Sequence, residues 1–74
     1  GDEAHRLFRA ELAAWVLREE ESMDIDEMSE IICQDFGLKI EKNDLKAACE
    51  QAGFYWDSIM NCVYQSYDIY YDEV

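Results

Sequence analysis

Groups that could catalyse a reaction are few in this sequence. Its single histidine, His5, lies near the N-terminus beside Arg6 and Arg9, where we expect it to be exposed to solvent. General acid–base catalysis needs a titratable group held in a shared pocket with its partners, and no such pattern surrounds His5. With 18 Asp and Glu residues, neighbouring carboxylates also arise by chance. We therefore predict that the chain is not an enzyme.

The three cysteines do not form a metal-binding pattern. Cys33, Cys49 and Cys62 lie far apart, whereas a zinc-binding pair is separated by about two to four residues. Each lies in an apolar helical pattern, where a thiol behaves as a small buried hydrophobic group. The segment Met23–Glu27 offers three carboxylates but lacks the glycine turn of a calcium loop. We therefore expect no metal ion, no cofactor, and an intracellular location in the cytoplasm or nucleus, where thiols stay reduced.

Charge is distributed unevenly along the sequence. The net charge is −12, and no lysine or arginine follows Lys46. Such a surface repels phosphate backbones and anionic lipids, and it attracts proteins with basic faces. We therefore expect neither direct nucleic-acid binding nor membrane binding. The expected partner is another protein with a basic or mixed basic and apolar face.

The elements that must position these groups are predicted to be helices. Residues 3–20 repeat apolar side chains at three- and four-residue spacing, which predicts an amphipathic helix. A second helix is predicted over residues 26–35, because Asp24 or Asp26 can cap its start and Gly37 can end it.

The second half of the chain is predicted to continue with two more helices. Asn43 or Asp44 can cap the third, and Gly53 ends it. The fourth is predicted over residues 56–67, with an aspartate or serine cap and an apolar stripe. Residues 68–74 either extend this helix or form an acidic, tyrosine-rich tail.

Together these segments predict an all-α fold, a small bundle of four short helices. With 74 residues, the chain has room for one acidic helical domain over 1–74. Because it starts with Gly1 rather than methionine, we expect the domain to be excised from a longer protein. No apolar run approaches the roughly 20 residues that span a bilayer. The third and fourth helices also outline a helix-turn-helix, although the fourth has no lysine or arginine with which to read DNA.

The order of elements from Met28 to Tyr67 is similar to that of a known family. A short helix is followed by a loop that opens with Phe36-Gly37-Leu38, a second short helix, a glycine, and a third helix begun by Trp56-Asp57. This order resembles the ubiquitin-associated superfamily of three-helix domains, including its UBA and CUE branches. The resemblance leaves the first helix as an addition and implies ubiquitin as a partner. It places the contacts at Phe36, Gly37 and Leu38 in the loop and at Met60, Val63 and Tyr64 on the last helix.

Aromatic side chains gather in the acidic last third of the chain. Apolar stripes of helices are usually core, which assigns Trp15, Ile32, Leu45, Ile59 and Val63 to the interior. A chain this small cannot bury all of its remaining rings, and tyrosine is enriched at interfaces. This argument and the resemblance together predict the partner-binding residues Phe36, Leu38, Phe54, Tyr55, Met60, Val63, Tyr64 and Tyr67, with Tyr70 and Tyr71 also exposed.

These observations predict a non-catalytic protein–protein interaction module, such as an adaptor domain, that binds its partner through an acidic, aromatic-rich face. The alternative is an acidic mimic of nucleic acid that inhibits a DNA- or RNA-binding protein, with the carboxylates between Glu19 and Glu30 in the place of phosphates. High salt weakens binding by mimicry, whereas binding through an apolar centre survives it.

Overall fold

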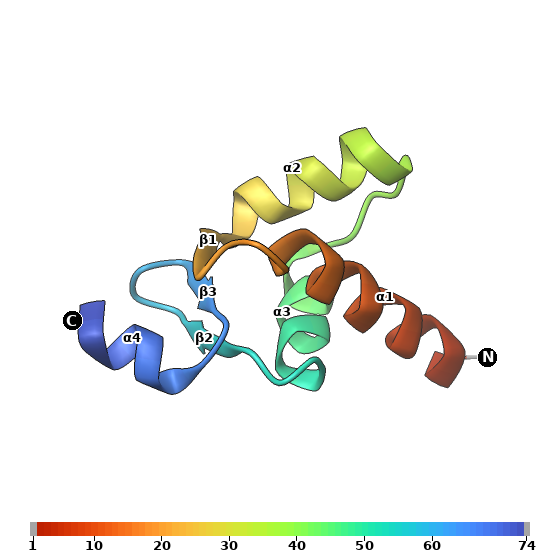
Figure 1. Cartoon of the computed structure of the whole chain (residues 1–74). Coiled ribbons are helices and arrows are strands. Elements are labelled where there is room, and N and C mark those ends of the chain that lie inside the picture. Colours follow the sequence, from red (N-terminus) through yellow and green to blue (C-terminus); the bar gives the residue numbers. More distant parts are fainter. Residues whose placement is uncertain (1, 74) are drawn as a thin grey trace.

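The computed structural model describes residues 2–73, which form four helices and a small antiparallel sheet (Figure 1). The strand order in the sheet is β1-β3-β2. The prediction of an all-α bundle is therefore wrong. In chain order the elements are α1 (Asp2–Leu17), β1 (Ser22–Asp24), α2 (Ile25–Phe36), α3 (Lys42–Gln51), β2 (Tyr55–Asp57), β3 (Cys62–Tyr64) and α4 (Tyr67–Glu73).

The segment predicted as the fourth helix is a β-hairpin instead. Val63 in β3 lies opposite Met23 of β1 on one side and Trp56 of β2 on the other. The turn between β2 and β3 contains Asn61 at a φ of 58°, a left-handed conformation that a continuing helix does not allow. The third helix that the ubiquitin-associated resemblance implied is thus replaced by this hairpin. Strands of three residues are too short to show a two-residue period, so only their distant pairing identifies them.

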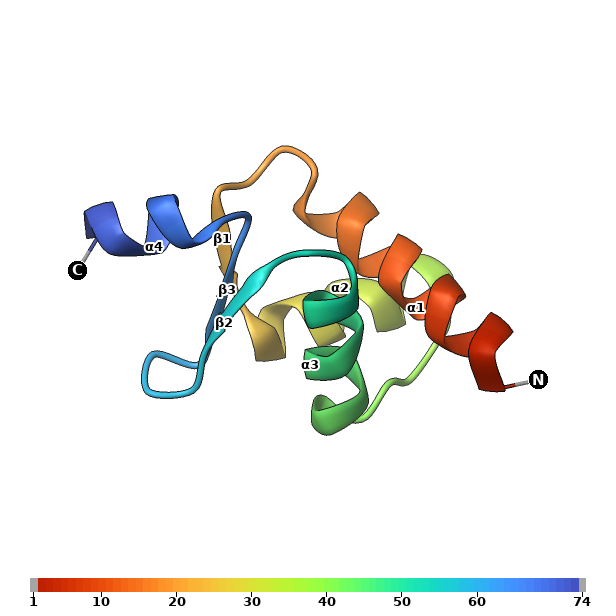
Figure 2. The same cartoon turned by 90° about the horizontal axis from the view of Figure 1, so that it is seen from below.

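The elements follow in the order of a helix and a strand, a helix pair, and two strands that close the sheet onto the first strand. In this arrangement α2 and α3 are the helix pair, and the β2–β3 hairpin follows them. Figure 2 shows the three strands side by side, with the β2–β3 turn projecting away from α2 and α3. The helix pair therefore lies one element earlier in the chain than the sequence predicted.

The first helix has the predicted apolar face, but it ends earlier than predicted, at Leu17. Leu12, Ala13, Val16 and Leu17 are buried along this face. Trp15 was assigned to the core, yet it is 55% exposed because it lies at the edge of the apolar stripe rather than at its centre.

The caps of α2 agree with the sequence. The carboxylate of Asp24 accepts hydrogen bonds from the backbone N–H groups of Asp26 (2.8 Å) and Glu27 (3.4 Å). At the other end, Gly37 has a φ of 68° and donates its N–H to the carbonyl of Cys33 at 3.0 Å. These contacts satisfy backbone groups that a helix leaves without partners, and they define α2 locally.

The start of α3 differs from the prediction. Glu41 occupies the cap position without a side-chain hydrogen bond, and α3 begins at Lys42, before the predicted caps. Its end is as predicted, since Gly53 has a φ of 93° and Phe54 donates its N–H to the carbonyl of Cys49 at 2.9 Å. The left-handed glycine turns the chain out of α3 and into β2.

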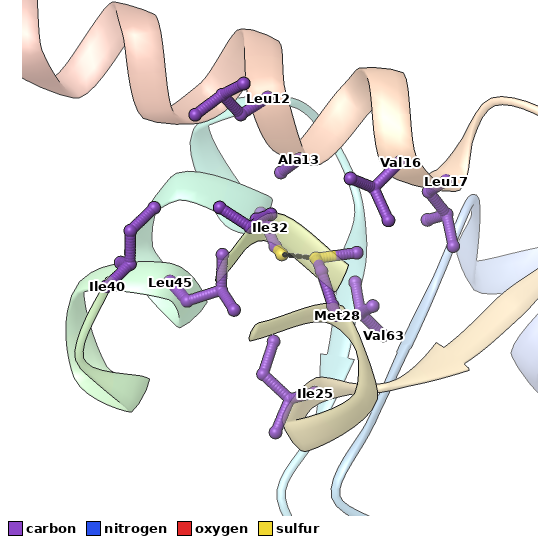
Figure 3. Packing of buried hydrophobic residues seen from close by; sticks show 11 residues of the cluster. Leu12, Ala13, Val16, Leu17, Ile25, Met28, Ile32, Ile40, Leu45 and Val63 are labelled. Carbon is purple, nitrogen blue, oxygen red and sulfur yellow. Dashed lines mark hydrogen bonds between the residues drawn. The ribbon is translucent and has the colours of Figure 1, made fainter. Parts of the chain in front are cut away.

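One hydrophobic core joins the three main helices to the sheet (Figure 3). Its centre includes a contact of 3.6 Å between the Cys49 and Met28 sulfur atoms. Ile32, Leu45 and Val63 are fully buried, as predicted. The cluster consists of Leu12, Ala13, Val16, Leu17, Ile25, Met28, Ile32, Ile40, Leu45, Cys49 and Val63.

Candidate protein-binding surface

The β2–β3 turn exposes two large apolar side chains. Ile59 is 90% exposed and Met60 is 58% exposed. The assignment of Ile59 to the core is therefore wrong, because the residue lies in a turn and not on a helical stripe. We refer to Ile59 and Met60 together as the turn tip.

A buried carboxylate holds the turn tip in place. Asp57 is only 7% exposed, and its Oδ1 atom accepts hydrogen bonds from the backbone N–H groups of Ile59 (2.9 Å) and Met60 (3.4 Å). The sequence predicted Asp57 or Ser58 as a helix cap. The bonds of Asp57 are those of a cap, since an aspartate accepts from N–H groups two and three residues later both at a helix start and in a turn. Here the chain continues as a turn, and the turn tip has a fixed shape.

Asn61 attaches the far side of the turn to the start of α2. Its side-chain amide donates to the carboxylate of Asp26 at 3.0 Å and approaches both carboxylate oxygens of Asp24 at 3.4 Å. The backbone carbonyl of Asn61 also accepts from the N–H of Ile25 at 3.0 Å. The turn is therefore connected to the body of the protein on both sides, and an acidic side chain, Asp26, lies beside it.

All five tyrosines of the chain form a single cluster between the sheet and α4. The ring centroids of Tyr55 and Tyr70 are 4.6 Å apart, and those of Tyr64 and Tyr70 are 5.2 Å apart. Tyr67 contacts Tyr55 edge-on at 5.2 Å and Tyr71 at 6.3 Å. These separations are those of favourable aromatic pairs. The sequence left undecided whether the residues after Tyr67 are helical. In the structure they belong to α4 (Tyr67–Glu73), which packs on the sheet through its tyrosine rings.

Tyr70 joins the tyrosine cluster to the turn. Partial burial raises the pKa of its hydroxyl above the ordinary value, and the negative charge of Asp57 and a hydrogen bond to Asp57 raise it further. Because Asp57 also fixes the backbone of the turn tip, one carboxylate connects α4 with the turn. Figures 1 and 2 show α4 and the turn at the same end of the molecule, opposite the N-terminal half of α1. We call this the C-terminal end.

The structure brings together only part of the predicted contact set. Met60 and Tyr67 are exposed at the C-terminal end, while Val63 and Tyr64 are buried and cannot offer their side chains to a partner in this fold. Tyr55 is half-buried in the tyrosine cluster beside Tyr67. The remaining predicted residues lie elsewhere: Phe54 is half-buried before β2, Phe36 is exposed at the end of α2, and Leu38 is half-buried in the loop after it.

Sequence reasoning missed Ile59 as a surface residue. Its spacing from Val63 is four, which fits one face of a helix as well as it fits a hairpin. The signal that could have identified it is the turn chemistry on either side, with Asp57-Ser58 before it and Asn61 after it.

The residues after Lys46, among them the β2–β3 hairpin and α4 at the C-terminal end, include acidic residues but no lysine or arginine. Asp68 and Asp72 are exposed on α4, and Asp26 lies beside the turn. A partner approaching the turn tip therefore meets apolar side chains within an acidic surrounding.

A pocket of about 240 Å³ lies between the end of α1 and α2, with Trp15, Met23, Ile31 and Asp35 among its lining residues. The guanidinium carbon of Arg18 lies 3.8 Å from the centre of the Trp15 ring. The protein's own arginine thus covers the ring face that a partner's cation would use.

The described residues offer no arrangement for metal binding. Across residues 2–73, no group of three His, Cys, Asp or Glu side chains could hold a metal ion. No helix in that range is long and apolar enough to cross a membrane. Comparisons with protein-family models, with curated proteins and with solved structures give no match for this chain.

Proposed function

We propose that the chain is a non-catalytic protein-binding domain whose C-terminal end contacts a partner with a basic and apolar face. The observation that carries this proposal is the turn tip, where Ile59 and Met60 project into solvent from a hydrogen-bonded turn. Large apolar side chains exposed together on a small protein mark interaction surfaces.

The rigidity of the turn supports binding by insertion. A flexible loop would lose conformational entropy on docking, whereas a turn already fixed by Asp57 and Asn61 loses little. Tyr67 and Tyr71 add exposed rings at the same end, and tyrosine contributes large contact area with few rotatable bonds. The turn tip would be the central anchor, and the rings would surround it.

The negative surroundings define the chemistry of the partner. An acidic rim accelerates association with basic proteins and excludes acidic ones. Ubiquitin, which has an apolar patch ringed by basic residues, is one protein with this chemistry. We place the interaction inside the cell, because a chain with the exposed thiol of Cys33 and the buried thiol of Cys49 suits a reducing compartment.

A role in DNA reading is not part of this proposal, although α2 and α3 form a helix pair. In a helix-turn-helix the second helix of the pair enters the major groove. Here that helix, α3, has Lys42 and Lys46 balanced by Asp44 and Glu50. The amine of Lys46 also lies 4.8 Å from the centre of the Trp56 ring. A helix without net positive charge on a protein of charge −12 is poorly suited to phosphate contacts.

The proposal is tested by affinity purification with a double variant of the turn tip, Ile59→Ser with Met60→Ser. Both side chains are exposed, so the fold should be retained, which circular dichroism checks. The matched control is Leu7→Ser, which changes an exposed apolar residue of α1 at the opposite end. Partners should be recovered with the wild type and the control but reduced at least tenfold with the double variant.

The salt dependence of the recovered complex separates this function from nucleic-acid mimicry. A complex centred on apolar side chains should persist in about 1 M salt, where the screening length is about 3 Å. Equal recovery with the double variant would contradict the proposal. If the complex is lost in high salt and is recovered equally with the wild type and the double variant, the result favours mimicry.

A further inference from the structure

Two of the six basic residues, Arg9 and Lys39, lie with His5 around one pocket at the end of the molecule opposite the turn tip. This pocket, of about 250 Å³, lies between α1 and the loop that precedes α3. Among the side chains that the structure describes, no acidic one lines it, although the chain as a whole has 18 acidic residues. We call it the α1 pocket, and its lining residues are His5, Phe8, Arg9, Leu38, Lys39 and Ile40.

The α1 pocket has an apolar interior and a cationic rim. Phe8 is 49% exposed, and Leu38 and Ile40 pack toward the core beneath it. Lys39 is exposed at the rim. Arg9 lies there too, and its ion pair with Asp44 is long, 3.9 Å, and open to solvent. An exposed pair of this kind contributes little, so the arginine can turn to another carboxylate at small cost.

The turn tip has the complementary chemistry. Ile59 and Met60 offer an apolar projection, and Asp26 provides an exposed carboxylate beside it. One chain therefore carries both an apolar projection with acidic surroundings and an apolar pocket with basic surroundings. The β2–β3 turn and the N-terminal half of α1, which contribute to them, lie at opposite ends of the molecule (Figure 2).

From this complementarity we infer that the turn tip of one copy binds the α1 pocket of a second copy. The inference rests on the proposed function, because it names the partner of the same turn tip. Two copies of net charge −12 repel each other in most orientations. Contact between the acidic end of one copy and the cation-lined pocket of the next is the orientation that this repulsion penalises least.

Such a contact is heterologous, because the two surfaces that meet are different. A pair retains one unused α1 pocket on the first copy and one unused turn tip on the second, so further copies can add head to tail. The product is a chain of copies whose length rises with concentration. Local contacts between carboxylates and the rim cations survive moderate salt, while the long-range repulsion between copies is screened beyond about 8 Å at physiological ionic strength.

The test is sedimentation velocity of the purified chain over a range of concentrations up to about 1 mM. The turn-tip variant is Ile59→Asp with Met60→Asp, and the pocket variant is Phe8→Asp. All three positions are exposed, so none of the substitutions removes a core side chain. The wild type should exceed twice its mass of 8.7 kDa as concentration rises. Each variant alone should remain a monomer.

Mixing the two variants gives the most specific result. The turn-tip variant keeps an intact pocket and the pocket variant keeps an intact turn tip, so an equimolar mixture should form a dimer and nothing larger. Leu7→Asp, on the same turn of α1 but outside the pocket, should associate like the wild type. Lys39→Glu, an exposed change of charge at the rim, should weaken association at least tenfold without altering the circular dichroism spectrum.

The result that overturns the inference is a wild type that stays monomeric at about 1 mM, or association that the turn-tip variant leaves unchanged. If the wild type is monomeric but the turn-tip variant recovers less of a different partner protein in affinity purification, self-association alone is rejected and the proposed function is kept. Unchanged recovery of partners together with a monomeric wild type would reject both.

Discussion

At the scale of single residues, Asp57 has the largest structural role of the acidic side chains at the C-terminal end. It is buried, it accepts two backbone hydrogen bonds in the turn, and it lies next to the hydroxyl of Tyr70. Most other carboxylates of the chain contribute charge to the surface. This one fixes the shape of the surface that we propose to bind a partner.

Asp57→Ala should therefore destabilise the fold by about 1–2 kcal/mol, the usual loss when a capping side chain is removed. Urea unfolding followed by fluorescence measures the change, and Asp68→Ala is the control, because Asp68 is exposed on α4. Asp57→Asn keeps an acceptor oxygen and should lose less. Equal stability of the Asp57→Ala and Asp68→Ala variants would show that the carboxylate does not hold the turn.

Cys49 provides a pH-dependent prediction at the same scale. Burial, with a smaller contribution from the charge of Glu50, raises the pKa of its thiol from 9.0 to about 12. The unfolded chain loses this proton at lower pH than the folded chain does, so the contribution of Cys49 to stability is complete below pH 9 and is lost as the pH rises toward 12.

Cys49→Ala should accordingly flatten the fall in the free energy of unfolding between pH 9 and 12, as measured by urea unfolding at a series of pH values. Cys33→Ala, which changes an exposed thiol, should keep the slope of the wild type. The prediction fails if the two variants show the same slope.

At the scale of elements, α4 depends on its tyrosines. It has seven residues, and an isolated helix of fewer than about 12 residues is not stable in water. Tyr70 supplies contacts to Tyr55, Tyr64 and Tyr67, whereas Tyr71 contacts Tyr67 at a longer distance. The helix is therefore formed by docking and not by its own propensity.

Tyr70→Ala should release α4 while the rest of the fold remains. Amide hydrogen exchange of residues 67–73 should approach the rate of an unstructured chain, with protection in α2 and α3 unchanged. Tyr71→Ala should leave α4 protected. Retained protection in the Tyr70→Ala variant would mean that contacts other than the rings hold this helix.

At the scale of the whole molecule, self-repulsion opposes the folded state. The net charge of −12 is confined to a body of 37 × 23 × 22 Å. Among the described side chains, those of residues 3–72, the ion pair between Arg9 and Asp44 is the single salt bridge, and it is long and exposed. Attraction between charges therefore offsets little of this repulsion.

Salt should consequently stabilise the isolated domain. At about 0.01 M salt the screening length is about 30 Å and spans most of the molecule, whereas at about 1 M it is about 3 Å. The urea midpoint should rise as sodium chloride is added over this range, measured at a protein concentration where sedimentation shows a monomer. A midpoint that falls would show that attractive pairs dominate.

The sequence was sufficient for the local features of the molecule. Asp24 caps α2, Gly37 ends it, and Gly53 ends α3, because each of these residues acts through hydrogen bonds or dihedral angles within a few residues of itself. The net charge and the absence of basic residues after Lys46 are likewise independent of the fold.

Only the tertiary structure decided whether the segment from Trp56 to Tyr67 forms a helix or a hairpin. Its apolar spacing fits a helix, and Asp57 forms the bonds of a helix cap, so local information favours the wrong element. The strands form because Val63 pairs with Trp56 across the hairpin and with Met23 of β1 on its other side, and β1 is distant in the sequence. The same pairing buries Val63 and leaves Ile59 in solvent. The acidic character of the candidate surface was therefore determined by the sequence, while its apolar centre was decided by contacts that form only in the folded chain.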